Sequence, residues 1–270
     1  MTIDEFEPHH PVGVELQQDV SAADWIAPRL LPISRAAGTR VCAIVPQGYE
    51  AYIRVFHHTY EQVGETWVRR RWSDIAERTG RQMHPAVQFD RFSAANGPNE
   101  GSLDEAESTA LVAILREHTA TPEECWLAIW HGYGFMVPGG STLFGDWEPG
   151  LRGWLKRQLA RQPQVKLHAD LAHAPTISLP NREYYLYRGP IDVVKRFEFG
   201  RAGLYSPNLW WPNDRAWIVA SEIDFDSTLV ACNRACAAAL LASDLETLEI
   251  EPESRLDIDG DTINPRLNAN

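Results

Sequence analysis

Segments in which apolar and polar residues alternate recur along the chain, and each predicts a β-strand. Residues 40–46 and 50–56 form the clearest pair, because Gln47 and Gly48 between them can turn the chain into a hairpin. Residues 227–232 either extend the strand before them or return beside it. Further strands are expected at residues 125–131, 182–188, 215–225 and 245–250.

Apolar residues spaced three and four positions apart predict four longer helices and a short one from Ser21 that Pro28 kinks or shortens. Gly80 can end the first longer helix in a left-handed conformation. Ser102 and Glu105 have the spacing of a capping box that opens the second helix, and Asn233 can cap the last. The longer helices are expected at residues 67–79, 103–118, 151–159 and 234–242.

This order of elements predicts an α+β fold, with a mixed, mainly antiparallel sheet and helices packed against it. We expect a single domain over residues 21–252, in which residues 136–175 are the candidate seam between subdomains. Residues 1–20 are expected to form an acidic N-terminal arm, and residues 253–270 a mobile acidic C-terminal tail.

Composition narrows the class of protein further. The chain has 270 residues, of which 44% are hydrophobic, so it can bury a sizeable core and need not be disordered. No apolar run reaches the roughly 18 residues of a membrane span. Six acidic residues precede the first arginine, Arg29, which is the reverse of the basic start of a signal peptide. A cytoplasmic location is therefore expected.

The chain carries 25 basic and 37 acidic residues, for a net charge of −12, which argues against binding to nucleic acid. Basic residues gather at 69–81 and 151–166, either as solvated helix faces or as anion-binding surfaces. Four scattered cysteines indicate free thiols. Cys232 and Cys236 can share a helix face, but no nearby histidine or cysteine completes a zinc site, so no metal site is assigned.

The strongest candidates for a reactive or metal-binding site are three carboxylates. If residues 217–226 form one strand, Glu222, Asp224 and Asp226 fall on the same face of it. Carboxylates this close repel one another, so they need a neighbouring cation or a raised pKa. That cation could be Mg²⁺ or Ca²⁺, or an arginine, for which the candidates are Arg54, Arg188 and Arg215; the strand end could also be exposed to solvent.

Ten tryptophans are the second unusual feature of the sequence. Trp210, Trp211 and Trp217 flank Asp214 and Arg215, and aromatic faces beside charged groups suit a sugar ring, a nucleobase or a cationic ligand. In the alternative interpretation, the tryptophans close the hydrophobic core. Residues 206–214, which also hold two prolines, favour a stiff loop.

Histidines follow several predicted elements, at positions where active sites are often built. None has the spacing of a zinc-protease helix, and each is also compatible with a structural role. Residues 257–268 copy the start of a calcium loop but lack its glycine and its final glutamate at the required positions. The histidines concerned are His57, His58, His84, His118 and His131.

Several strings in the sequence resemble those of a group of cytoplasmic actinobacterial proteins with no established activity. The resemblance covers about residues 20–252. It implies a compact bacterial protein and carries over no catalytic residue. The strings are Ser206-Pro-Asn-Leu-Trp-Trp-Pro-Asn-Asp-Arg-Ala-Trp217, Glu222-Ile-Asp224, Val45-Pro-Gln-Gly-Tyr-Glu-Ala-Tyr52 and Thr119-Ala-Thr-Pro122.

Taken together, these features favour a non-catalytic binding or regulatory protein of the inhibitor or immunity type, whose acidic surface meets a more basic protein partner. The alternative is a hydrolase that uses Glu222, Asp224 or Asp226, with or without a metal ion, on a sugar-like or nucleotide-like ligand. No motif in the sequence specifies a cofactor, and a small-molecule ligand is the other possible partner.

Overall fold

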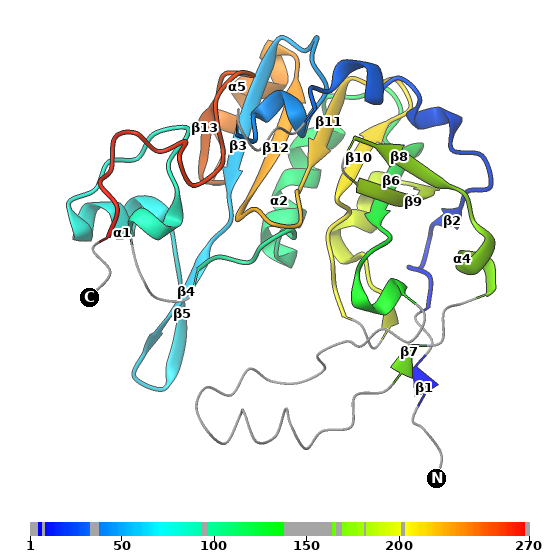
Figure 1. Ribbon diagram of the computed structural model, residues 1–270, viewed down its shortest axis with the longest axis horizontal. Coiled ribbons are helices and arrows are strands. Elements are labelled where there is room, and N and C mark those ends of the chain that lie inside the picture. Colours follow the sequence, from blue (N-terminus) through cyan, green and yellow to red (C-terminus); the bar gives the residue numbers. More distant parts are fainter. Residues whose placement is uncertain are drawn as a thin grey trace.

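The computed structural model describes residues 5–6, 9–32, 38–92, 97–137, 164–165, 169–180, 182–200 and 203–267. An antiparallel sheet runs through this part of the chain (Figure 1). Most of the candidate seam at 136–175, and the whole helix expected at 151–159, lie outside the described residues.

Within the described residues, the main sheet has nine strands, and every pair of neighbours in it is antiparallel. A separate parallel pair joins β1 (Glu5–Phe6) to β7 (Gln164–Val165). In the order of the main sheet, the strands are β13 (Thr247–Glu249), β3 (Ala51–Phe56), β12 (Ser227–Cys232), β11 (Trp217–Ala220), β10 (Leu209–Pro212), β6 (Cys125–Trp130), β9 (Arg182–Gly189) and β2 (Glu15–Leu16), and β8 (Thr176–Leu179) also pairs with β9.

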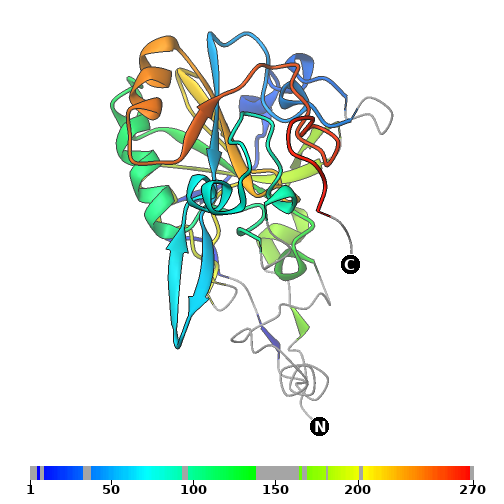
Figure 2. The ribbon, with the colours of Figure 1, turned by 90° about the vertical axis from the view of Figure 1, so that its left-hand side faces the viewer.

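The two faces of the sheet are covered by different kinds of element. Helices α2 (Glu105–Arg116) and α5 (Arg234–Leu241) pack on one face (Figure 2). Short 3-10 turns, including Val41–Ala43, cover the other. Because side chains alternate along a strand, Trp210 belongs to the first hydrophobic layer and its neighbour Trp211 to the second. The fold is therefore α+β, as the sequence predicts.

A smaller cluster lies beyond the end of β3. Helix α1 (Trp72–Thr79) places Trp72 against Phe56, Phe89 and Phe92. Gly80 ends this helix with a φ of 65°, as predicted. The short helix α4 (Ala169–His173) precedes β8.

The long helices and several strands lie where the sequence places them. In α5, the Asn233 side chain accepts a hydrogen bond from the Cys236 amide at 2.9 Å, as expected of a cap. The capping box of α2 is shifted by two residues from the prediction, because Asp104 and Glu107 form it instead of Ser102 and Glu105. Strands β6 and β13 lie within the segments predicted for them, and β9 extends one residue beyond its segment.

The hairpin predicted from residues 40–46 and 50–56 is wrong. The second segment does contain a strand, β3, but its two edges are taken by β12 and β13. Residues Val41–Ala43 form a 3-10 turn that packs on the sheet face beside Tyr52. Pairing with two strands that are distant in the sequence therefore outweighs the local turn at Gln47 and Gly48.

Two further boundaries differ from the prediction. The helix expected at 67–79 begins only at Trp72, because the Glu246 carboxylate, far away in the sequence, accepts the amides of Trp72 and Ser73 at 2.7 Å each. The stiff loop expected at 206–214 contains the central strand β10. Its prolines do not prevent this, since Pro212 is the last residue of the strand.

Strand β2 and the C-terminal residues 253–267 both pack on the domain. Strand β2 pairs with β9 at the edge of the sheet. Near the C-terminus, Leu256 is buried and its amide donates to the Thr39 carbonyl at 2.8 Å, while Asp261 accepts from His84 at 2.8 Å. Residues 253–267 are therefore held in place, unlike the mobile tail that their acidity suggests. Among the described residues, no helix has the length and apolar character needed to cross a bilayer.

Candidate functional site

The three candidate carboxylates lie in a turn and not on one strand. Strand β11 ends at Ala220, and residues 221–226 reverse the chain into β12, which returns beside β11. The strand expected at 215–225 is therefore too long, and its shared carboxylate face does not form. The turn still brings Glu222 and Asp224 together, but it sends Asp226 to a different partner.

Glu222 and Asp224 share one arginine. Arg182, the first residue of β9, donates from Nε and Nη2 to Glu222 Oε1 at 3.0 and 2.7 Å, and Nη2 also lies 2.7 Å from Asp224 Oδ2. The guanidinium lies over the Trp130 ring, 5.7 Å from its centroid. Burial raises the pKa of Glu222, and the charge of Arg182 opposes that rise. The pair is thus a partly buried, charge-assisted contact.

Asp226 belongs to a second arginine site. Arg54 is only 1% exposed, and its guanidinium donates to Ser227 Oγ at 2.8 Å and to the Val87 carbonyl at 2.7 Å. The Asp226 carboxylate lies 3.5 Å from the same group. Burial lowers the pKa of Arg54 to about 10, and Asp226 opposes this shift. The contacts of Arg54 tie β3, β12 and the loop before Phe89 together, which is a structural role.

These contacts correspond to the arginine alternative of the sequence analysis, and Arg54 is one of its three candidates. The other two candidates lie elsewhere, since Arg188 contacts Glu124 at 2.7 Å and Arg215 lies over the Trp25 ring. Arg182 was missed because no local pattern links β9 to the turn after β11. In the described ranges, no group of three or more histidine, cysteine, aspartate or glutamate residues is arranged to hold a metal ion.

The tryptophans of the predicted ligand site form part of the core. Trp210, Trp211 and Trp217 are all buried, and Trp217 donates from its indole nitrogen to the Leu115 carbonyl at 3.0 Å. Asp214 accepts from the Ala120 amide at 2.7 Å and fastens two loops together. Arg215 has a φ of 57° at the turn that follows β10. These five residues present no open aromatic face, so the core alternative describes them better.

His57 and His58, which follow β3, are also buried. His57 Nδ1 lies 2.7 Å from the Asn99 carbonyl, and Nε2 lies 2.8 Å from Thr228 Oγ1, which in turn lies 2.6 Å from Ser221 Oγ. Burial lowers the pKa of His57, so its neutral form is favoured. A neutral ring donates from one nitrogen and accepts at the other, which fits the carbonyl and the hydroxyl on its two sides.

A surface that sequence analysis missed is the hairpin of β4 (Thr59–Val63) and β5 (Thr66–Arg70), which we call the β4–β5 arm. It extends away from the body of the domain (Figures 1 and 2). Among the described strands, β4 and β5 pair only with each other, so both edges of the arm are open. Tyr60, Val63 and Trp67 are 41%, 48% and 53% exposed, which is unusual for large apolar side chains.

The register of the arm shows which backbone groups are open. Val63 and Thr66 flank a two-residue turn in which Gly64 has a φ of 63°. In such a hairpin the pair next to the turn is hydrogen-bonded, and the pairs then alternate. Gln62 with Trp67 and Tyr60 with Arg69 are therefore the pairs whose backbone N–H and C=O groups point outward.

The base of the arm is fixed to the start of α2. The Tyr60 hydroxyl donates to Asp104 Oδ2 at 3.0 Å, and Arg69 lies 3.3 Å from the same oxygen. His58 donates its amide to Glu107 Oε1 at 2.7 Å. Although burial opposes it, hydrogen bonds from His58 lower the pKa of Glu107, so the carboxylate stays charged. The base of the arm is thus held by contacts with α2, while Trp67 is exposed to solvent.

The sequence did contain a signal for this arm. Residues 59–70 alternate in polarity around Gly64 and Glu65, which is the pattern of a hairpin. Placing Trp67 at the start of a helix concealed that pattern.

Comparisons of the chain with protein-family models, with curated proteins and with solved structures found no match.

Proposed function

We propose that this protein is a non-catalytic binding protein of the regulatory type, which docks a partner protein along the β4–β5 arm. The observation that carries the proposal is the arm itself, because it is a braced hairpin with two open strand edges and three exposed large apolar side chains. Natural proteins usually cover or charge such edges, because an open edge invites another strand to pair with it.

The backbone of the arm supports docking by strand addition. Outward N–H and C=O groups at Gln62 and Tyr60 on one edge, and at Trp67 and Arg69 on the other, can pair with an extended segment of the partner. Such pairing supplies affinity through main-chain hydrogen bonds, while side chains on alternate positions supply specificity. Trp67 and Tyr60 share one face of the arm and are of the residue types that dominate interface energetics.

Charge favours a basic partner. The net charge of −12 would accelerate association with a protein of opposite sign. Not all acidic residues serve this purpose, since Glu246 is buried at the start of α1 and Glu249 is paired with Arg234. Along the arm, Arg70 is matched by Glu61, so the docking edge itself is close to neutral. We therefore propose that the acidic surface of the domain attracts the partner protein and that the β4–β5 arm contacts it.

The hydrolase alternative finds less support. It would require Glu222, Asp224 or Asp226 to face a substrate with free carboxylate oxygens. Instead, Arg182 contacts the first two and Arg54 contacts the third. These ion pairs occupy the carboxylates, although burial raises the pKa of both Glu222 and Asp226.

The proposal is tested first by placing a photo-reactive amino acid at position 67 of the whole protein and cross-linking in an extract of the source cells. The recovered partner is purified, and its affinity is measured for Trp67→Ala and Gln62→Pro. Proline removes an outward N–H and leaves the pairing inside the hairpin intact. Each change is expected to weaken binding about tenfold or more, as at an interface hot spot.

The matched control is Ile263→Ala, which truncates a side chain that is 50% exposed outside the arm. It should leave the affinity unchanged. Unchanged binding by Trp67→Ala and Gln62→Pro, or cross-linking that is as strong from position 263 as from position 67, would contradict the proposal.

A further inference from the structure

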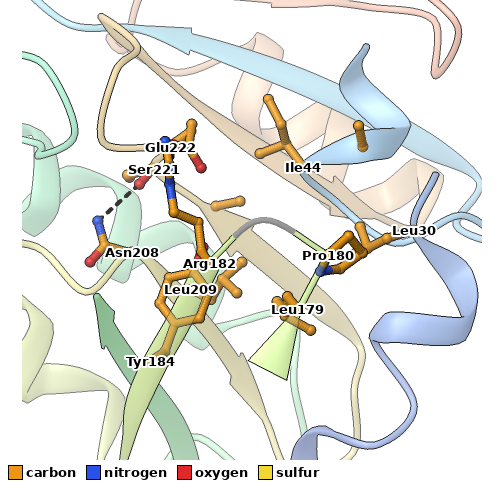
Figure 3. Close-up of a pocket in the computed structure, with 12 residues that line it drawn as sticks. Leu30, Ile44, Leu179, Pro180, Arg182, Tyr184, Asn208, Leu209, Ser221 and Glu222 are labelled. Atoms are coloured by element: carbon orange, nitrogen blue, oxygen red, sulfur yellow. Dashed lines mark hydrogen bonds and ion pairs between the residues drawn. The ribbon is translucent and has the colours of Figure 1, made fainter. Parts of the chain in front are cut away.

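Two hollows in the described part of the chain differ greatly in size. The pocket where β9 begins, shown in Figure 3, measures about 20 Å³, which is room for about one water molecule. A groove beside the start of α2 measures about 480 Å³ in the same way, so it can receive a side chain of another molecule. The lining of this groove includes Glu100, Leu103, Asp104, Glu105, Leu204 and Tyr205.

The groove adjoins the base of the β4–β5 arm. Asp104, which lines the groove, accepts the Tyr60 hydroxyl at 3.0 Å and lies 3.3 Å from Arg69. Tyr60 and Arg69 are also the outward-pointing backbone pair closest to that base. A segment that pairs with either edge of the arm therefore ends its pairing beside the groove, where its next side chains can enter.

One part of the groove is apolar. Leu204 is 45% exposed there, and the neighbouring Tyr205 is half-buried. The centroid of the Tyr205 ring lies 4.7 Å from that of the Phe135 ring, so the core holds the tyrosine in place. Lysine and arginine side chains lay their alkyl stems along apolar surface of this kind while their charged heads reach polar groups.

The other part of the groove carries carboxylates that lack a positive charge. Within the described residues, neither Glu100 nor Glu105 has an ion-pair partner, whereas Asp104 is matched by Arg69. Burial raises the pKa of Glu100, and the negative charges of two aspartates in the turn after β11 raise it further. A cation beside Glu100 would favour its charged form.

The arrangement of these groups decides which cation fits. In the described ranges, the acidic residues do not form a group that could hold a metal ion. An anion would face three carboxylates at once. A basic side chain suits both parts of the groove, since its stem can cover Leu204 while its head pairs with Glu100 or Glu105.

We infer that this groove receives a lysine or arginine side chain of the protein partner that docks on the β4–β5 arm. The identity of the occupant rests on the proposed function, and the inference adds that the docked segment carries a basic residue next to the stretch that pairs with the arm. The carboxylates thus select among segments that could all pair with the backbone of the arm.

The groove is tested on the whole protein with two probes, Nα-acetyl-lysine amide and Nα-acetyl-norleucine amide, which share one alkyl stem and differ in the ammonium group. Backbone amide shifts are followed by NMR. The lysine probe is expected to give saturable shifts centred on Ser102, Leu103 and Tyr205, and the norleucine probe to bind about threefold more weakly or worse. Equal binding of the two probes, or shifts centred elsewhere, would overturn the inference.

A double variant makes the test specific to the groove carboxylates. Glu100→Gln combined with Glu105→Gln keeps the shape of both side chains and removes both charges, so the preference for the lysine probe should disappear. The matched control combines Glu77→Gln with Glu251→Gln, which removes the same charge from two exposed positions outside the groove and should keep the preference. A preference that persists in the groove variant would remove the basis for the site.

The partner recovered through position 67 separates this inference from the proposed function. Its affinity should fall about fivefold in the groove variant, as expected for two partly exposed charge contacts, and stay unchanged in the control. A loss with Trp67→Ala but not with the groove variant would overturn the inference and leave docking on the arm intact. A loss with the groove variant but not with Trp67→Ala would contradict docking on the arm and support the groove as a site for a basic side chain.

Discussion

Several charged residues in this protein stabilise the fold by joining separate segments through ion pairs and hydrogen bonds. Arg54 binds the carbonyl oxygens of Pro85 and Val87 and, from a second segment, the side chains of Asp226 and Ser227. Arg182 joins the start of β9 to the turn after β11. Removing one member of such a buried set leaves its partners without hydrogen bonds, which costs more than the pair contributes when intact. The acidic residues that attracted attention in the sequence are therefore explained by partners that only the fold brings near.

His57 gives this residue-level account a pH dependence. Because burial lowers its pKa, the unfolded chain takes up a proton below about pH 6.5 more readily than the folded protein does. The contribution of neutral His57 to the free energy of unfolding is thus fully present above that pH. It should fall as the pH drops, by up to about 1.4 kcal/mol per pH unit. Urea unfolding at pH 7.5 and pH 5 measures this loss.

His57→Gln should unfold more easily at every pH, since it disturbs the bonds to Asn99 and Thr228, but the decline between the two pH values should be smaller. His131→Gln, at an exposed position, is the control that should keep the wild-type decline. A decline that is the same in His57→Gln as in the wild type would show that another group is responsible.

At the level of elements, the sequence predicted what is stabilised locally. The inner stripe of α2, the Asn233 cap of α5 and the buried run of β6 are signals contained within a few residues. It failed where distant pairing decides the structure. The sequence predicted a loop where strand β10 lies, because prolines are unfavourable in strands. Pairing with β11 and β6, which the local sequence does not reveal, makes the segment a strand. For the same reason, the sequence indicated Glu222 and Asp224 but not Arg182, which pairs with both.

The β4–β5 arm depends on its turn. Gly64 has a φ of 63° and open space where a side chain would lie, so a substitution there is opposed by backbone strain alone. Gly64→Val should therefore speed amide exchange throughout the arm about tenfold or more, as expected for a cost of roughly 1–2 kcal/mol.

Global unfolding of Gly64→Val should stay close to that of the wild type, because the arm lies outside the main sheet and its cores. Glu65→Ala, at the second turn position, is the control and should leave exchange unchanged. If Gly64→Val left amide exchange in the arm unaltered, the left-handed conformation of residue 64 would not be what stabilises the hairpin.

On the scale of the whole molecule, an antiparallel sheet with two covered faces carries the uncovered β4–β5 arm, and a small pocket lies where β9 begins (Figures 1 and 3). The sheet edge at β13 is short, whereas the arm leaves longer edges open. In an acidic protein whose candidate carboxylates are held by arginines, this asymmetry favours recognition over catalysis.

The most direct test of that account is residue-resolved amide hydrogen exchange of the whole protein, with and without the partner captured through position 67. Strand addition predicts that exchange slows at the outward amides of one edge, either Tyr60 and Gln62 or Trp67 and Arg69, while the sheet is unaffected. Protection confined to other surfaces, with the arm exchanging as fast as in the free protein, would contradict it.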